Sequence, residues 1–131
     1  MNTFYMKILH LLYASILLGS LSLGAVTARG DVPESQRDEV MHLLEFVNST
    51  DCTFERNGTK HTGEEASKHI KRKYKHYRDK ITTTEEFIEY SATKSTISGK
   101  EYLVYCGNGP PVKSRDWLLE ELKVYRQNGV N

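Results

Sequence analysis

The uncharged, apolar run near the N-terminus constrains this chain more than any other feature. Lys7 is the only charged residue among the first 28, and residues 8–23 read ILHLLYASILLGSLSL before the small residues of GAVTA. A short basic start, an apolar stretch and small residues at its end are typical of a secretory signal peptide. We therefore expect cleavage after Ala28, so that residues 1–28 are a signal peptide and residues 29–131 form one folded domain.

An uncleaved membrane anchor is the alternative. The uncharged run from residue 8 to residue 28 is close in length to the roughly 20 apolar residues that can span a bilayer. His10, Tyr13 and several serines weaken it as a span. Both alternatives place the domain outside the cytoplasm, in the periplasm or secreted, and we expect membrane contact only through this segment if it is not cleaved.

Export changes how the two cysteines are interpreted. Oxidising compartments favour disulfides, whereas reducing compartments favour free thiols or metal sites. Cys52 and Cys106 are the only cysteines of the chain, and we expect them to form one disulfide. In the chain-entropy treatment, closing a loop of this size contributes on the order of 4 kcal/mol. A catalytic thiol is the alternative, but disulfide pairing already accounts for both sulfur atoms.

Length and charge limit the possible functions. A chain of 131 residues has the size of one domain. Without Lys7 it carries 17 basic and 17 acidic residues, so its net charge is near zero. A near-neutral, exported chain has no general attraction for polyanions, and we do not expect nucleic acid as a partner.

Apolar periodicity predicts two helices in the first half of the folded part. Pro33 suits a first helical turn, and an apolar stripe follows it to about Asn48. Thr62 and Glu65 form a capping box that starts the second helix. The predicted buried residues of these two helices are Val40, Leu43, Leu44, Val47, Ala66, Ile70, Tyr74, Tyr77 and Ile81.

The second half predicts two more helices. Overlapping capping boxes at Thr82 and Thr83 start a short third helix that ends near Ala92. The stretch that begins at residue 107 reads GNGPPVK, and we expect an exposed loop there because Gly and Pro interrupt regular structure. Ser114 is expected to cap the last helix.

Two short segments alternate as β-strands do. Residues 52–55 alternate apolar and polar side chains, and Asn57-Gly58 suits a tight turn that returns residues 59–61 as a second strand. Residues 101–106 read EYLVYC, which is rich in strand-forming residues. A disulfide would bring the two segments together, because bridged Cα atoms lie about 6 Å apart. The predicted fold class is α+β, with about four helices around a small antiparallel sheet and one disulfide.

Residues 68–80, KHIKRKYKHYRDK, are the most basic segment of the chain. The row opposite the apolar stripe of this helix consists of Lys68, Lys71, Lys75 and Arg78. The row that flanks the stripe consists of His69, Lys73, His76 and Lys80. Cations beside a buried stripe can be held in fixed positions and bind anions selectively, whereas a plain solvated face is the alternative. The tyrosines between them lie at core spacing, which makes them poor platforms for stacking bases.

Motifs for common chemistries are missing from the sequence. It has no nucleotide-binding loop, no zinc-ligand spacing and no nucleophile elbow. The only candidate metal ligands are His69 and His76, with His61 as a possible third. His69 and His76 lie two helical turns apart, which is too far to hold one metal ion alone, so we expect no metal and no cofactor. A hydrolase could use these histidines with Lys73 as the anion-binding group, but Asp79, the acid of this helix, points elsewhere.

A set of short motifs extends over about residues 40–122. Its members are Phe54, Arg56, Asn57, Gly58, Ala66, His69, Lys73, Arg78, Ile81, Glu85 or Glu86 with Phe87 and Ile88, and Ser98, Gly99 and Tyr102. As a set they resemble the YfeK-like family of small exported bacterial proteins, a domain of unknown function. The resemblance implies this architecture and a place in the bacterial envelope, and it brings no established activity.

The polar members of that set are the candidate site. We expect Arg56, His69, Lys73 and Tyr102 to bind an acidic ligand or an envelope protein, in an exported domain that is not an enzyme. A small hydrolase on the same helix is one alternative. A structural or protein-interaction domain is the other, in which Arg56 pairs with an acid across the turn and His69 and Lys73 hold a strand end or a carboxylate.

Overall fold

The fold is that of residues 30–129 in a computed structural model of the chain. In chain order the elements are α2 (Glu34–Ser49), β1 (Thr53–Arg56), β2 (Thr59–His61), α3 (Gly63–Tyr77), the 3-10 helix η1 (Arg78–Lys80), α4 (Thr84–Ala92), β3 (Leu103–Tyr105), β4 (Val112–Lys113) and α5 (Ser114–Asn128). The predicted signal peptide, residues 1–28, lies outside the described residues, so its cleavage stays a prediction. Within the described part, no helix is long and apolar enough to cross a membrane.

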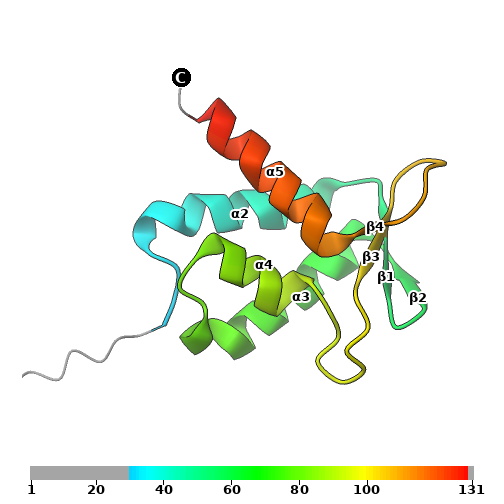
Figure 1. Cartoon of the computed structure of the whole chain (residues 1–131), viewed down its shortest axis with the longest axis horizontal. Coiled ribbons are helices and arrows are strands. Elements are labelled where there is room, and N and C mark those ends of the chain that lie inside the picture. Colours follow the sequence, from blue (N-terminus) through cyan, green and yellow to red (C-terminus); the bar gives the residue numbers. More distant parts are fainter. Residues whose placement is uncertain (1–29, 130–131) are drawn as a thin grey trace, which may run out of the picture.

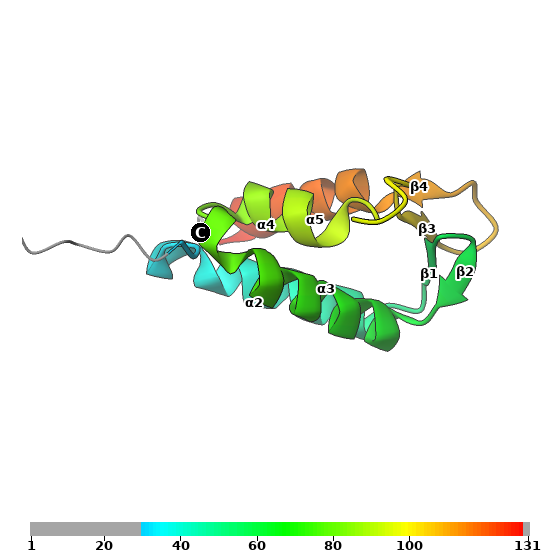
Figure 2. The same cartoon turned by 90° about the horizontal axis from the view of Figure 1, so that it is seen from below.

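The α-helices form two layers, and the small sheet lies at one end of them (Figure 1). Figure 2 shows α2 and α3 side by side in one layer, α4 and α5 in the other, and the strands beyond the ends of both layers. The predicted class, α+β with about four helices and a small antiparallel sheet, is confirmed.

The sheet has the strand order β2-β1-β3-β4, and each neighbouring pair is antiparallel. In the central strand β1, Phe54 lies opposite His61 of β2 and Val104 of β3. Asn57 and Gly58 form the turn between β1 and β2 with positive φ angles of 51° and 79°. Such angles are typical of the tight hairpin turn that this dipeptide predicted.

The core lies between the helix layers and continues to the sheet. The buried residues of α2 are the predicted Val40, Leu43, Leu44 and Val47. They pack with buried side chains from the rest of the chain, among them Ile70, Ile81, Phe87, Ile88, Val104, Leu118 and Leu122. The Phe46 ring stacks on Trp117 with centroids 4.4 Å apart, and Trp117 meets Phe54 edge-on at 5.6 Å. These aromatic contacts join α2, α5 and β1.

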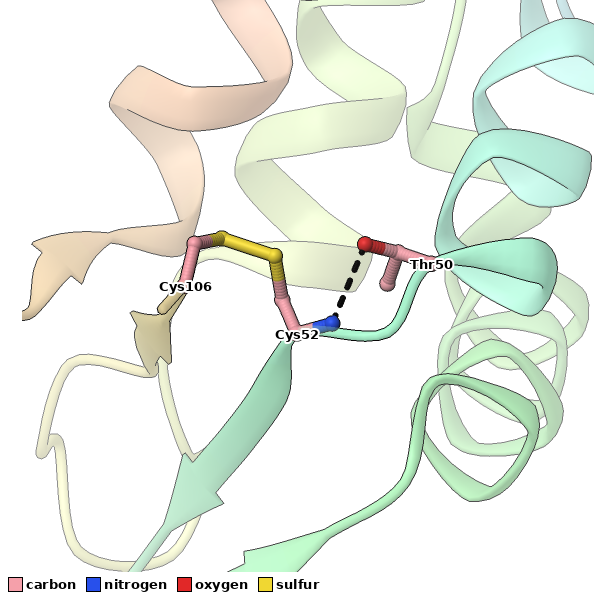
Figure 3. The surroundings of a disulfide bond; sticks show 3 residues. All are labelled: Thr50, Cys52 and Cys106. Atoms are coloured by element: carbon pink, nitrogen blue, oxygen red, sulfur yellow. Dashed lines mark hydrogen bonds between the residues drawn. A yellow bond between two sulfur atoms is a disulfide. The ribbon is translucent and has the colours of Figure 1, made fainter. Parts of the chain in front are cut away.

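Cys52 and Cys106 form the predicted disulfide, with their Cα atoms 4.5 Å apart. The bridge lies one position beyond the strand pair Thr53–Tyr105, just before β1 and just after β3 (Figure 3). The backbone N–H of Cys52 donates to the hydroxyl of Thr50 at 3.2 Å. The disulfide therefore joins two neighbouring strands through cysteines that lie 54 residues apart in the sequence.

The helix starts at α3 and α4 follow their capping residues. Thr62 accepts a hydrogen bond from the backbone of Glu65, and the Glu65 carboxylate accepts one from the backbone of Thr62, which completes the predicted capping box. Of the two overlapping boxes, Thr83 supplies the cap of α4 by accepting from the backbone of Glu86 at 3.1 Å. The Glu86 carboxylate instead accepts from the N–H and hydroxyl of Thr82, both at 2.7 Å.

Two expectations for the C-terminal part are wrong. Val112 and Lys113, predicted in an exposed loop, form β4, in which Val112 lies opposite Val104. Ser114 is the buried first residue of α5 and not its cap. Its backbone N–H donates to the carbonyl of Tyr102 at 2.9 Å. Strand β4 therefore leads directly into α5. The Gly- and Pro-rich sequence did not indicate this strand, because it forms only by pairing with β3.

Tyr74 and Tyr77 are only half-buried, although their spacing predicted a fully buried stripe. The hydroxyl of Tyr74 donates to Asp31, and that of Tyr77 donates to Thr96 at 3.1 Å. The Tyr74 ring packs edge-on against Phe87 at 5.1 Å. Each ring thus covers the core while its hydroxyl binds a surface segment, which is how tyrosine commonly bridges the two environments.

Candidate functional site

The four candidate residues meet where α3 approaches the sheet. Arg56 ends β1 and shares the face of Phe54, because alternate side chains of a strand point the same way. His69 and Lys73 lie one turn apart on α3. Tyr102 comes immediately before β3, and its side chain is buried. The structure therefore collects them from three separate parts of the chain.

Tyr102 is the centre of the contacts among these residues. Its hydroxyl oxygen lies 3.1 Å from His69 Nε2 and 3.5 Å from Lys73 Nζ. The Lys73 ammonium also donates a hydrogen bond of 2.6 Å to the backbone carbonyl of Lys94. His69 and Lys73 are thus held by neighbouring elements, whereas His76 and Lys80 of the same predicted row are exposed. Only half of that row has the fixed environment that selective anion binding requires.

Positive charges surround His69. Arg72 lies beside it, with Nη2 3.5 Å from His69 Nδ1, and we call Arg56, His69, Arg72 and Lys73 the basic cluster. Burial lowers the pKa of His69 from 6.5 to about 4, and repulsion by the three cations adds to this effect. Burial, followed by repulsion from Arg56, also lowers the pKa of Lys73. At neutral pH the basic cluster therefore holds three cations around an uncharged imidazole.

The cations of the basic cluster have no acidic partner in the described part of the chain. No carboxylate of residues 30–129 lies within salt-bridge distance of Arg56, Arg72 or Lys73. The pairing of Arg56 with an acid across the turn, one feature of the structural alternative, is not formed, whereas Lys73 does hold the backbone at Lys94, which forms a β-bridge with Glu101. Charge in the cluster is thus balanced by no ion pair, and only Arg72 of its three cations is exposed to solvent.

The nearest acids are engaged in other contacts. The Glu55 carboxylate lies 2.7 Å from Lys60 Nζ and accepts a hydrogen bond of 2.9 Å from the hydroxyl of Tyr105. Glu65 closes the capping box of α3, and its carboxylate lies 3.7 Å from His61 Nδ1. Because β1 alternates its side chains, Glu55 points away from the face that carries Arg56.

A small cavity adjoins the basic cluster between the β1–β2 hairpin and α3. Its volume is about 20 Å³, room for about one water molecule. Phe54, Ala66 and Ile70 supply the apolar wall. The rest of the lining comes from polar residues, namely Glu55, Arg56, His61, His69, Tyr102 and Ser114. His61 Nε2 is buried there without a hydrogen-bond partner. We call this space the inner cavity.

The inner cavity contains residues that sequence reasoning did not assign to the site. His61 was considered only as a possible third histidine of a metal site, and Phe54 only as part of a motif. The signal that could have found both is the hairpin itself, since a two-residue Asn-Gly turn sets the register and places His61 opposite Phe54. The packing of α3 against this pair, which closes the cavity, has no local sequence signal.

The histidines do not form a metal centre in the described structure. Within residues 30–129, no group of three or more His, Cys, Asp or Glu side chains lies close enough to hold a metal ion. His76 packs on the Tyr77 ring at 4.7 Å, whereas His69 faces Tyr102. What the arrangement offers chemically is a fixed positive potential, a hydroxyl and two imidazoles around a small cavity, which suits an anion.

Comparison with known proteins gives two matches and no activity. The model of a family of unknown function, DUF5329, matches residues 34–126. The uncharacterized protein YfeK of Salmonella typhimurium is 46% identical over 60 residues, which cover 46% of this chain and 50% of that protein. The chain thus aligns with about half the length of this curated relative. No solved structure matches. The resemblance inferred from the motifs is confirmed.

Proposed function

Because the chain belongs to the DUF5329 family, whose function is unknown, we propose a function from the basic cluster itself: the domain binds an anionic ligand without turning it over. The observation that carries this proposal is that Arg56 and Lys73 are half-buried and lack a carboxylate partner in residues 30–129. Partly buried charges are normally paired, because removing them from water is unfavourable. A bound anion supplies the missing partner.

The electrostatics of the cluster support the same conclusion. Burial and mutual repulsion lower the pKa values of His69 and Lys73, so the folded protein carries unfavourable interactions at this place. An anion next to Arg56 and Lys73 would remove the repulsion and accept charge-assisted hydrogen bonds, which are stronger than neutral ones. Perturbed groups that gather beside a cavity are characteristic of binding sites.

We also propose that the protein acts in the periplasm or after secretion. The N-terminal apolar segment motivates this location, and the Cys52–Cys106 disulfide supports it because such bonds persist in oxidising compartments. Alkaline phosphatase fused after residue 131 would be active if the segment exports the chain. An inactive fusion that accumulates in the cytoplasm would contradict export.

Binding of inorganic phosphate tests the proposed function most directly. We expect saturable binding to the purified protein in a calorimeter, and at least about a tenfold loss of affinity in Lys73→Ala and in Arg56→Ala, because each removes a charged hydrogen-bond donor. Lys68→Ala is the matched control. It removes one positive charge from the same helix, but Lys68 pairs with Glu64 on the exposed side, 2.7 Å away.

Equal weakening by Lys68→Ala would mean that phosphate responds only to net charge. An absence of binding to phosphate, acetate and sulfate would overturn the proposal and favour the alternative of a protein-interaction domain of the envelope. In that case partners that copurify with the protein should be insensitive to Arg56→Ala and Lys73→Ala.

A small hydrolase remains the second candidate, and one observation favours it. His69 is uncharged at neutral pH and its Nε2 lies 3.1 Å from a hydroxyl, so it could accept a proton. A general base normally has a group that orients it, and no carboxylate of the described residues contacts His69. Turnover of a phosphoester or carboxylic ester that His69→Ala abolishes, with the fold intact, would replace the binding proposal by this one.

A further inference from the structure

The inner cavity restricts which anion the basic cluster can take. Its volume of about 20 Å³ admits one water molecule or one methyl-sized group, but no complete phosphate. A ligand of the cluster can therefore place only a small part of itself inside, while its charged group stays with Arg56 at the edge. The size of the inner cavity thus limits the size of the group that lies next to the charge of the ligand.

The walls of the inner cavity favour an apolar group. Phe54, Ala66 and Ile70 are 5%, 8% and 4% exposed and belong to the hydrophobic core, so the cavity is a gap in that core that opens toward the cluster. An apolar group placed against these side chains leaves water and gains dispersion contacts. An anion that is polar all round cannot use this surface.

One buried polar atom near the inner cavity lacks a hydrogen-bond partner that a small ligand could supply. His61 lines the inner cavity, and its Nε2 is buried without a hydrogen-bond partner in residues 30–129. Buried polar atoms are nearly always paired, so an unpaired one calls for a partner that the protein does not provide. A carboxylate oxygen held by Arg56 could accept a hydrogen bond from an Nε2–H, and a water molecule could do so as well.

We propose that the ligand of the basic cluster is a compact carboxylate that carries a methyl-sized apolar group next to the charged end. The carboxylate lies between Arg56 and His61, and the methyl group enters the inner cavity against Phe54, Ala66 and Ile70. This inference rests on the proposed function and names its ligand class. Acetate is the smallest acid with this chemistry, and propionate and butyrate carry larger apolar groups.

A series of carboxylates tests the inference by NMR titration of the purified protein, followed through backbone amide shifts of β1, β2 and α3. Acetate should bind about fourfold more tightly than formate, which is the gain expected for burying one methyl group. Butyrate should give no further gain, because the inner cavity is full. Phosphate in the same series reports on the proposed function independently.

Substitutions of Ala66 then change the space without changing the charge. Ala66→Val fills the inner cavity and should reduce the acetate-to-formate ratio from about fourfold to about one. If this variant fails to fold, Ala66→Gly enlarges the space instead and should make propionate or butyrate bind more tightly than acetate. Lys68→Ala on the exposed side of α3 is the control, in which the ratio is unchanged.

The outcomes separate the two proposals. If phosphate binds but formate and acetate bind equally, the ligand class is wrong and the proposed function stands, with an ordered water filling the inner cavity. If neither phosphate nor any carboxylate binds, the proposed function fails and this inference fails with it. A ratio of about four that disappears in Ala66→Val, together with a changed 15N shift of His61 Nε2 on adding acetate, supports the inference.

Discussion

His69 shows how strongly neighbouring residues determine the chemistry of a side chain. Burial first, and then repulsion by Arg56, Arg72 and Lys73, lower its pKa from 6.5 to about 4. The unfolded chain takes up this proton near pH 6.5, whereas the folded protein does so only near pH 4. The contribution of this group to the free energy of unfolding therefore falls as the pH drops from 6.5 to 4.

Titration of His69 provides the corresponding prediction. Its ring protons should show no transition between pH 8 and pH 5 in an NMR titration. Arg56→Gln should raise the pKa of His69, because it removes the largest of the repulsions by neighbouring charges while keeping a polar side chain of similar length. A His69 that titrates near 6.5 in the unmodified protein would mean that the cluster is more solvated than the structure shows.

Asp31 gives the free energy of unfolding a second pH dependence, which has a different origin. Burial opposes its charge, but hydrogen bonds from Tyr74 and Arg78 outweigh this effect and hold its pKa below 3.8. The resulting stabilisation is present above pH 3.8 and is lost as the pH falls through the lower folded-state pKa. Asp31→Asn should lower the free energy of unfolding by about 1–2 kcal/mol at pH 7 in urea denaturation. This difference should shrink toward pH 2, and an equal loss at both pH values would contradict the ionic explanation.

At the scale of elements, α3 has to satisfy two neighbours at once. Its first residue, Gly63, lies so close to the end of α2 that a Cβ atom there would come 2.3 Å from the carbonyl oxygen of Val47. Further along, Ile70 packs in the core while His69 and Lys73 approach Tyr102. The close approach of α2 and α3 therefore depends on a residue without a side chain.

Gly63→Ala tests this dependence on Gly63. Helix propensity alone predicts stabilisation, since alanine is favoured over glycine by up to about 1 kcal/mol inside a helix. The backbone contact predicts the opposite, and we expect a net loss of about 1–3 kcal/mol in urea denaturation because the two helices must move apart. Gly129→Ala is the control, since its Cβ would lie 3.5 Å from the nearest atom, an ordinary contact. A Gly63→Ala protein as stable as the original would show that α2 and α3 separate without cost.

The sheet contains a strand, β4, that forms only because another strand pairs with it. Strand β4 has only two residues, and neither its length nor its Gly- and Pro-rich approach indicated a strand. It exists because β3 offers an open edge, to which Lys113 and Val112 pair. The pairing sets the direction in which the chain enters α5, and it buries Ser114 beside Tyr102.

For the whole molecule, the disulfide is the covalent link between the two halves of the fold. It joins the chain after α2 to the chain after β3, and thus holds together β1, which carries Arg56, and β3, which follows Tyr102. By the entropy model a closed loop of 54 residues contributes about 4 kcal/mol. This contribution is a large part of the net stability of a small domain.

Removal of the disulfide should therefore affect the whole domain. A Cys52→Ser, Cys106→Ser double variant should lose about 2–4 kcal/mol in urea denaturation, and addition of a reductant should cause a similar loss in the original protein but none in the variant. The double variant avoids a single leftover thiol. A loss below about 1 kcal/mol would indicate that strand pairing alone holds β1 against β3.

The sequence alone determined the helices, their caps and the hairpin turn, because these depend on residues that are close together in the chain. The apolar stripes of α2 and the caps of α3 and α4 depend on side chains three or four positions apart, so the four helices and most of their bounds could be predicted. The Asn57-Gly58 turn and the cysteine pair similarly predicted the hairpin and the bridge between β1 and β3. Motifs spread along the chain also selected Arg56, His69, Lys73 and Tyr102 as candidates.

Only the tertiary structure decided what surrounds these residues. The packing of α3 against the sheet brings His69 and Lys73 within hydrogen-bonding reach of Tyr102, and no acid of residues 30–129 forms an ion pair with Arg56. The pairing of the strands engages Glu55 with Lys60 and Tyr105. The packing of α3 against the sheet also closes the inner cavity around His61, whereas the packing of α3 against α2 requires a glycine at position 63. The physical reason is that desolvation, repulsion and steric contact depend on distances in space between segments, which local periodicity and capping do not encode.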